Sequence, residues 1–173
     1  MFGIILIKMF KRILSLLKLI IWKILYGSRI DIEFSTIFYS NTKLVVDGAG
    51  KLFIGKNCFF NNGCSINSLC EISVGDYCIF GENVKIYDHN HKCDRTQKIP
   101  FKKQGYEMKK IKIGNNCWIG SNVTILAGVV IGDNVIVGAN TVVTKSIEKN
   151  KTIVSKVEYK ELEAKCYGKS KVN

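Results

Sequence analysis

Residues 113–147, IGNNCWIGSNVTILAGVVIGDNVIVGANTVVTKSI, repeat one six-residue pattern six times without a gap. An aliphatic residue stands at every sixth position, namely Ile113, Ile119, Ile125, Ile131, Val137 and Val143. Four positions after each of them comes a second compact residue, in turn Cys117, Val123, Val129, Val135, Thr141 and Ile147. Glycine, asparagine and aspartate, which favour turns, gather behind the aliphatic file. Neither a helix nor an alternating strand has this period.

Two apolar files at period six are typical of a hexapeptide parallel β-helix, in which three units close one triangular coil. The same pattern starts at Ile54, slips by two residues after Cys70 and resumes at Val74. Residues 32–46 keep no clear register, and we expect them to form the first coil or a capping strand. The sequence therefore predicts a mainly β solenoid over residues 31–147.

The repeat is interrupted over residues 87–112, which contain both histidines, the only proline and many lysines. Long insertions in compact domains are usually functional or disordered. We expect a loop that extends from one corner of the coil. After Ile147 the period is lost, and residues 148–173 are predicted to be a tail with a strand, a short helix and a polar end.

Residues 1–30 predict a very apolar amphipathic helix that is interrupted by cations too often to span a membrane. Positions 8, 11, 12, 15 and 18 hold Lys, Lys, Arg, Ser and Lys, and they share one helical stripe. Two interpretations stay open. The helix either anchors the protein on an anionic membrane surface or docks on the protein's own body or on a partner subunit.

The chain of 173 residues has 26 Lys and Arg against 14 Asp and Glu, a net charge of +12. Such a balance favours anionic partners: nucleic acid, a membrane surface or a phosphate-rich cofactor. No zinc-finger spacing, RNP-like motif or recognition helix is present, so nucleic acid is not expected. Of the seven cysteines, Cys58, Cys64, Cys70 and Cys117 follow the repeat and are expected to be reduced core residues. A cytoplasmic location, with a peripheral position on the inner membrane face as an option, follows.

Asp88, His89, Asn90 and His91 lie where the coil gives way to the loop, and histidine is the usual general base near neutral pH. A surface histidine in a polar turn is the simpler alternative. Cys93 and Asp94 raise the question of a metal site, but no fourth ligand completes the set, so no metal is expected.

Together, the repeat, the Asp-His-Asn-His box, the loop and the phrase over 113–147 resemble the galactoside and maltose O-acetyltransferase group, and within it the branch that acetylates cell-surface polysaccharides. The resemblance covers residues 54–147. It implies a left-handed coil, a homotrimer and transfer of an acetyl group from acetyl-CoA to a sugar hydroxyl. N-acetylation of an amino sugar nucleotide is the alternative within the same fold.

Carried over by position, the resemblance makes His89 the catalytic base and assigns Asn61 and His91 to the acceptor. The residues it assigns to acetyl-CoA are Gly81, Trp118, Ser121, Ala139, Thr144 and Lys145. The family's sugar-binding aspartate falls on Leu69, and the family's N-terminal cap is replaced by the basic apolar helix, so the acceptor differs from the family pattern more than the donor does.

Two other classes remain as alternatives. A zinc enzyme on the same coil needs three histidine ligands, and this chain has two histidines. A scaffold without catalytic activity would not bind acetyl-CoA.

Overall fold

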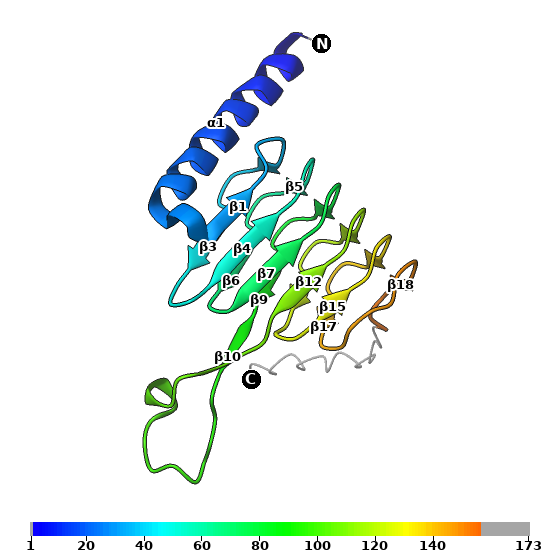
Figure 1. Ribbon diagram of the computed structural model, residues 1–173. Helices are drawn as coiled ribbons and strands as arrows, with labels where there is room; N and C mark the ends of the chain where they lie inside the picture. The colour runs from blue at the N-terminus through cyan, green and yellow to red at the C-terminus, as the bar shows by residue number, and fades with distance from the viewer. Residues whose placement is uncertain (1, 157–173) are drawn as a thin grey trace, which may run out of the picture.

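The computed structural model describes residues 2–156, which form one long N-terminal helix followed by a mostly β solenoid of about six turns (Figure 1). The first sheet contains β1 (Ile30–Ile32), β4 (Lys51–Ile54), β7 (Glu71–Val74), β12 (Ile111–Ile113) and β15 (Val130–Ile131). The second sheet contains β2 (Ile37–Phe38), β5 (Phe59–Phe60), β8 (Ile79–Phe80), β13 (Trp118–Ile119), β16 (Ile136–Val137) and β18 (Thr152–Ile153). The third contains β3 (Lys43–Val46), β6 (Ser65–Ser68), β9 (Lys85–Tyr87), β14 (Thr124–Ile125) and β17 (Val142–Val143).

Each turn of the chain adds one parallel strand to each sheet, so residues of one file stack directly on one another. The aliphatic residues at every sixth position from Ile113 to Val143 are buried, as are the compact residues four positions after each of them. In the N-terminal half, Phe38, Phe60 and Phe80 continue one file as stacked rings with centroids 4.8 and 4.2 Å apart. The predicted solenoid is therefore confirmed.

The corners depend on asparagines that accept a positive φ, which few other side chains tolerate. Asn116, Asn134 and Asn150 have φ between 53° and 61°, and their side chains form a ladder with N···O distances of 2.9 and 3.0 Å. Asparagine is thus selected twice at these corners, by backbone conformation and by the hydrogen bond to the next coil.

Buried cysteines satisfy the turn carbonyls of the next coil. Cys58 Sγ lies 3.0 Å from the Gly75 carbonyl oxygen, and Cys78 and Cys117 repeat this contact one and two coils later at 3.1 and 3.2 Å. The six cysteines within residues 2–156 are free thiols. Cys58, Cys64 and Cys117 are core residues as the repeat predicts, whereas Cys70 is only half-buried, so its expected core position is wrong.

Residues 30–46 form the first coil, and α1 (Phe2–Tyr26) lies across it (Figure 1). The polar stripe of α1 faces the coil. Arg12 Nη1 donates to the Thr36 carbonyl at 2.9 Å, Lys18 Nζ donates to the Tyr39 carbonyl at 2.8 Å, and Ser15 Oγ accepts from the Phe38 N–H at 2.8 Å. These backbone groups have no preceding strand to bond, so α1 caps the open end of the solenoid.

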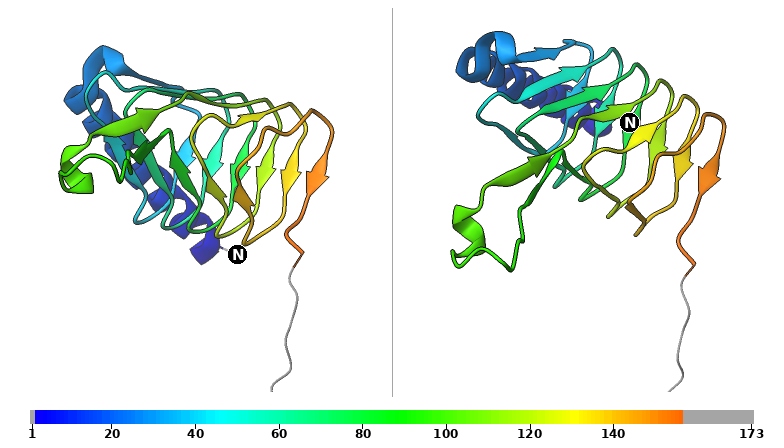
Figure 2. Two further views of the ribbon diagram at one scale, coloured as in Figure 1. Left: turned by 90° about the horizontal axis from the view of Figure 1, so that it is seen from below. Right: turned by 60° about the horizontal axis from the view of Figure 1, so that its bottom comes forward.

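An extruded loop leaves the coil after β9, at the corner between the third and first sheets (Figure 2). Its base is an antiparallel pair, β10 (His89–His91) with β11 (Tyr106–Met108), and its tip holds the short helix η2 (Phe101–Lys103). Buried Gln104 connects the two arms of the tip. Its Oε1 accepts a hydrogen bond from the Asp94 N–H, and its Nε2 donates to the carbonyl groups of Asp94 and Ile99. We call the corner between the third and first sheets, where the loop leaves the coil, the loop edge.

Beyond Ile147 the chain continues the coil for one more partial turn, in which β18 pairs with β16. The strand expected in the tail is therefore present. The expected short helix falls in residues 157–173, outside the described part of the chain. Within residues 2–156, no helix is both long enough and apolar enough to cross a bilayer.

Candidate functional site

Asp88 fixes the root of the extruded loop to the coil beneath it. Its carboxylate is fully buried and accepts hydrogen bonds from the backbone N–H groups of Leu69 and Cys70, at 2.9 and 2.8 Å. Ser68 Oγ lies 3.0 Å from the same carboxylate. Because a buried carboxylate is costly unless donors surround it, this arrangement holds Asp88 in one position.

The fourth partner of Asp88 is His89, whose Nδ1 lies 3.1 Å from Oδ1. A carboxylate only accepts hydrogen bonds, so Nδ1 carries the proton in this contact and Nε2 keeps its lone pair. The His89 side chain is 16% exposed, which leaves the ring partly accessible. The pair has the form of a general base held in one tautomer by an adjacent acid.

Aromatic side chains enclose this histidine. The rings of His89 and of Tyr106, from β11, meet at nearly a right angle with centroids 5.3 Å apart, and the Tyr87 ring lies 6.4 Å from that of His89. Tyr106 also contacts His91 at 4.5 Å, so one tyrosine bridges the two histidines of the box. His91 itself is exposed and lies two register positions further out on the hairpin, opposite Tyr106.

The hairpin does not assemble a metal centre. Within residues 2–156, no group of three or more His, Cys, Asp or Glu side chains is arranged to hold an ion. Asp94 turns to its own loop, where Thr96 donates to its carboxylate from both the backbone N–H and the hydroxyl. These hydrogen bonds lower the pKa of Asp94. Cys93 is exposed, and its thiol lies near the carbonyl of His91.

Four of the predicted residues line a different corner, between the second and third sheets. Asn61, Gly81, Ser121 and Ala139 occupy this corner in four successive coils, and we call it the small-residue edge. A Cβ on Gly81 would stand 2.5 Å from the Ser121 backbone nitrogen, so the close stacking requires glycine there. Trp118 lies beside this edge on β13 and is 56% exposed.

The other two predicted cofactor residues lie at the loop edge. Thr144 and Lys145 follow β17 in the fifth coil and are exposed. They border a hollow of about 220 Å³ near the end of the solenoid. Within one chain, the predicted residues therefore divide into a set at the loop edge, with His89, and a set at the small-residue edge, with Trp118.

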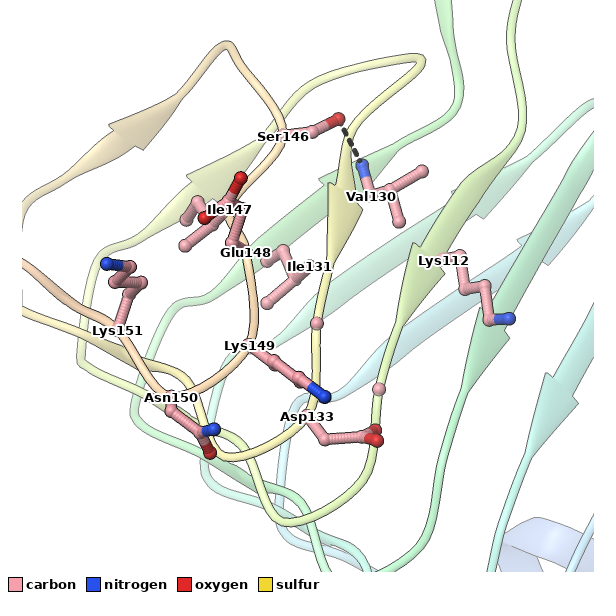
Figure 3. A pocket seen from close by; sticks show the side chains of 12 residues that line it. Lys112, Val130, Ile131, Asp133, Ser146, Ile147, Glu148, Lys149, Asn150 and Lys151 are labelled. Carbon is pink, nitrogen blue, oxygen red and sulfur yellow. Dashed lines mark hydrogen bonds between the residues drawn. The ribbon is translucent and has the colours of Figure 1, made fainter.

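A larger hollow of about 910 Å³ lies against the last coils on the first sheet (Figure 3). Lys112, Lys149 and Lys151 line it together with Asp133 and Glu148. No histidine and none of the predicted site residues borders this hollow. The size of this hollow alone therefore does not indicate a catalytic site. His89, enclosed at the loop edge, is the better candidate for a catalytic residue.

Two residues at the site were missed by sequence reasoning. The Asp-His-Asn-His box pointed to His89, but Asp88 was given no role, although an acid directly before a candidate base is a signal in itself. Tyr106 was not singled out, because it is 17 residues from His89 in sequence and meets it only through the pairing of β10 with β11.

The family model described as bacterial transferase hexapeptide (six repeats) matches residues 110–145. A Dictyostelium discoideum protein assigned by name as an acetyltransferase is 37% identical over 82 residues, which are 47% of this chain and 41% of that protein. The chain thus matches less than half the length of this relative.

Solved structures extend the similarity. A maltose O-acetyltransferase from Clostridium difficile 630 is 30% identical with a TM-score of 0.61, over 77% of this chain and 69% of that one. A galactoside acetyltransferase in complex with coenzyme A is 28% identical with a TM-score of 0.58, over 77% of this chain and 64% of that one.

Proposed function

Because the chain belongs to the hexapeptide-repeat acetyltransferases, we propose that it transfers an acetyl group from acetyl-CoA to a hydroxyl of a saccharide, with His89 as general base. The observation that carries the proposal is the buried carboxylate of Asp88, 3.1 Å from His89 Nδ1, because it leaves Nε2 as the proton acceptor. The likeness to maltose and galactoside enzymes supports the saccharide acceptor.

The reaction proceeds in one complex of enzyme, donor and acceptor. His89 Nε2 removes the proton of the acceptor hydroxyl, and the oxygen attacks the thioester carbonyl carbon of acetyl-CoA. A backbone N–H stabilises the negative charge on the carbonyl oxygen. The C–S bond then breaks, and the coenzyme A thiolate leaves with the proton that His89 holds. A general base of this kind contributes roughly 10²–10⁴ in rate.

Small side chains give acetyl-CoA a path along the solenoid. At the small-residue edge, Gly81, Ser121 and Ala139 leave backbone close to the surface, and Trp118 offers an exposed ring beside them. Thr144 and Lys145 at the loop edge provide a hydroxyl and a cation for phosphate groups. Calorimetry with coenzyme A tests this assignment, since a protein without a donor site would give no heat of binding.

The division between two edges supports a homotrimer in which each site joins the loop edge of one chain to the small-residue edge of the next. His89 and Trp118 would then serve one site from different copies. A complementation experiment tests the shared site. We expect the variants His89→Ala and Ala139→Trp each to be inactive alone. When the two are co-expressed and assemble at random, about a quarter of the interfaces join an intact loop edge to an intact small-residue edge, so about a quarter of wild-type activity should return.

Light scattering on the wild-type protein tests the homotrimer directly, and a monomeric mass would overturn it. Absence of any recovered activity in the mixed complexes would instead place His89 and Ala139 in one chain's site.

For the acceptor, we propose a sugar hydroxyl in cell-surface polysaccharide biosynthesis. Release of the coenzyme A thiol, followed with a panel of saccharides and with amino sugar nucleotides, separates O- from N-acetylation. Turnover with the amine acceptors alone would reject the hydroxyl assignment, while the donor and His89 assignments would stand.

A further inference from the structure

The N-terminal helix is docked with its polar side inward and its apolar side outward. Leu19 and Trp22 are buried against the coil next to Ser15, and Trp22 meets the Phe38 ring edge at 5.1 Å. Thirteen large apolar side chains of α1 are exposed by 44–76%, and all of them except Ile4 and Ile5 point away from the docked side, since a helix turns by about 100° per residue. This face is larger and more uniformly apolar than the patches that water-soluble proteins ordinarily expose.

The orientation follows from the hydrogen bonds at the end of the coil. Arg12 and Lys18 bind carbonyl groups that have no strand partner, and the Tyr26 hydroxyl donates to the Leu44 carbonyl at 3.0 Å. Turning the apolar face inward would break these contacts and leave the carbonyl groups unsatisfied. The apolar face is therefore held outward by the same contacts that cap the solenoid.

The composition of the face indicates a lipid surface rather than a protein partner. Protein interfaces are anchored by aromatic and arginine side chains and surrounded by a polar rim. The outer face of α1 is aliphatic except for Phe10, and a bilayer accepts such a face without complementary shape. A helix of 25 residues is about 37 Å long, so the face is an extended strip.

Charge at the borders of the face matches an anionic bilayer. Lys8 is exposed, and Lys23 lies beside the apolar face with its ammonium group 4.0 Å from the exposed carboxylate of Asp31, whereas Lys18 is bonded to the Tyr39 carbonyl. The helix contains no Asp or Glu. Cations placed beside an inserted apolar face lie at the level of the lipid headgroups, where each favours anionic lipid.

We propose that α1 binds the protein to the surface of a lipid bilayer through its outward apolar face, with the helix parallel to the membrane plane and the solenoid above it. Insertion of aliphatic side chains is the main attraction, and Lys8 and Lys23 add a preference for anionic lipid. This differs from the basic-face anchor considered from sequence, because Arg12 and Lys18 remain bonded to the first coil.

Flotation with vesicles tests the proposal on the full-length chain. Wild-type protein should float with phosphatidylcholine vesicles, float more completely when phosphatidylglycerol is included, and remain bound at high salt. Replacing Ile13, Leu17 and Ile24 by Gln, at the centre of the face, should lower the bound fraction at least about tenfold. Wild-type protein that stays at the bottom with both vesicles overturns the proposal, as does a triple variant that floats like wild type.

A matched variant controls for general loss of exposed aliphatic surface. Val45→Gln, Val130→Gln and Val142→Gln change three exposed valines of the solenoid and should leave flotation unchanged. If wild type fails to float but the α1 variant changes the oligomeric mass in light scattering, the face joins copies of the chain and the lipid proposal is wrong.

A second measurement reports the face directly. Phe10→Trp places a fluorophore on the outward side, and brominated lipid should quench it beyond the quenching of wild type. Equal quenching of the two proteins contradicts the proposed orientation. Coenzyme A binding by the triple variant is expected to match wild type, so failure of the membrane proposal leaves the acetyltransferase proposal intact.

Discussion

His89 Nδ1 lies 3.1 Å from Asp88 Oδ1, and Asp88 in turn receives two backbone N–H groups from the preceding coil. The solenoid therefore fixes the tautomer of His89 through Asp88, while Tyr106 of the loop hairpin packs against its ring. The contacts that fix this tautomer lie at the loop root, where Asp88 meets the backbone of Leu69 and Cys70.

Asp88→Asn should lower kcat by roughly 10²–10⁴ and leave KM for acetyl-CoA near wild type, because an amide can donate to His89 and favour the tautomer with a protonated Nε2. Steady-state thiol release measures both constants. Asn90→Ala, on the exposed neighbour, should retain wild-type kcat. A wild-type kcat in Asp88→Asn would show that Asp88 does not position the base.

Gly81→Ala should destabilise the fold by about 1–3 kcal/mol, because its Cβ would meet the Ser121 backbone nitrogen at 2.5 Å and a backbone atom must shift. Urea denaturation gives the free energy of unfolding. Gly3→Ala on α1 has open space around its Cβ and should be neutral or stabilising by up to about 1 kcal/mol. Equal stability of the two variants would refute the close packing at the small-residue edge.

Arg12→Ala should cost about 1–2 kcal/mol, because the Thr36 and Phe34 carbonyls both lose a charged donor. Hydrogen exchange should accelerate at the Phe38 amide, which is protected by Ser15 on the same helix. Lys8→Ala, on an exposed residue of α1, serves as the control. Unchanged exchange at Phe38 in Arg12→Ala would mean that the other contacts suffice to hold the cap.

Stability should fall as pH rises from about 9 towards 11, in part through Cys64. Burial raises the pKa of this thiol to about 11, above the unfolded value of 9.0. The unfolded chain therefore loses its proton first, and the stabilisation present below pH 9 is lost as pH rises through the folded pKa. Cys64→Ala should show a shallower decline in urea midpoint over this range. Parallel curves for the two proteins would exclude the thiol as a contributor.

The solenoid could be predicted because its sequence signal is repeated. Ile119 and Val137 are buried for the same reason in successive coils, and each unit confirms the register of the next. The first coil lacks this redundancy. Its strands are held in register by pairing with the second coil, as Ile37 pairs with Phe59, so only the folded chain shows its alignment.

The orientation of α1 could not be predicted, since periodicity shows which residues share a face but not which face meets the protein. The decisive groups are carbonyls such as that of Tyr39, which are invisible in a pattern of side chains. The position of Asp88 is similar, because its donors come from Leu69 and Cys70, nearly one coil earlier. The candidate base at His89 could be proposed from the chemistry of the Asp-His-Asn-His box at the loop root and from the family resemblance together.

The placement of α1 across the first coil also sets the distance of His89 from the outer face of this helix. His89 leaves the third coil, and strand spacings of about 4.8 Å together with a helix about 10 Å thick put it roughly 20–25 Å from the outer face of α1. With α1 on a bilayer, the solenoid would hold His89 at this distance from the membrane surface, so that only sugar units that reach the same distance are acetylated. Lipid-tethered saccharides on spacers of graded length would reveal such a dependence, and equal rates for all lengths would rule it out.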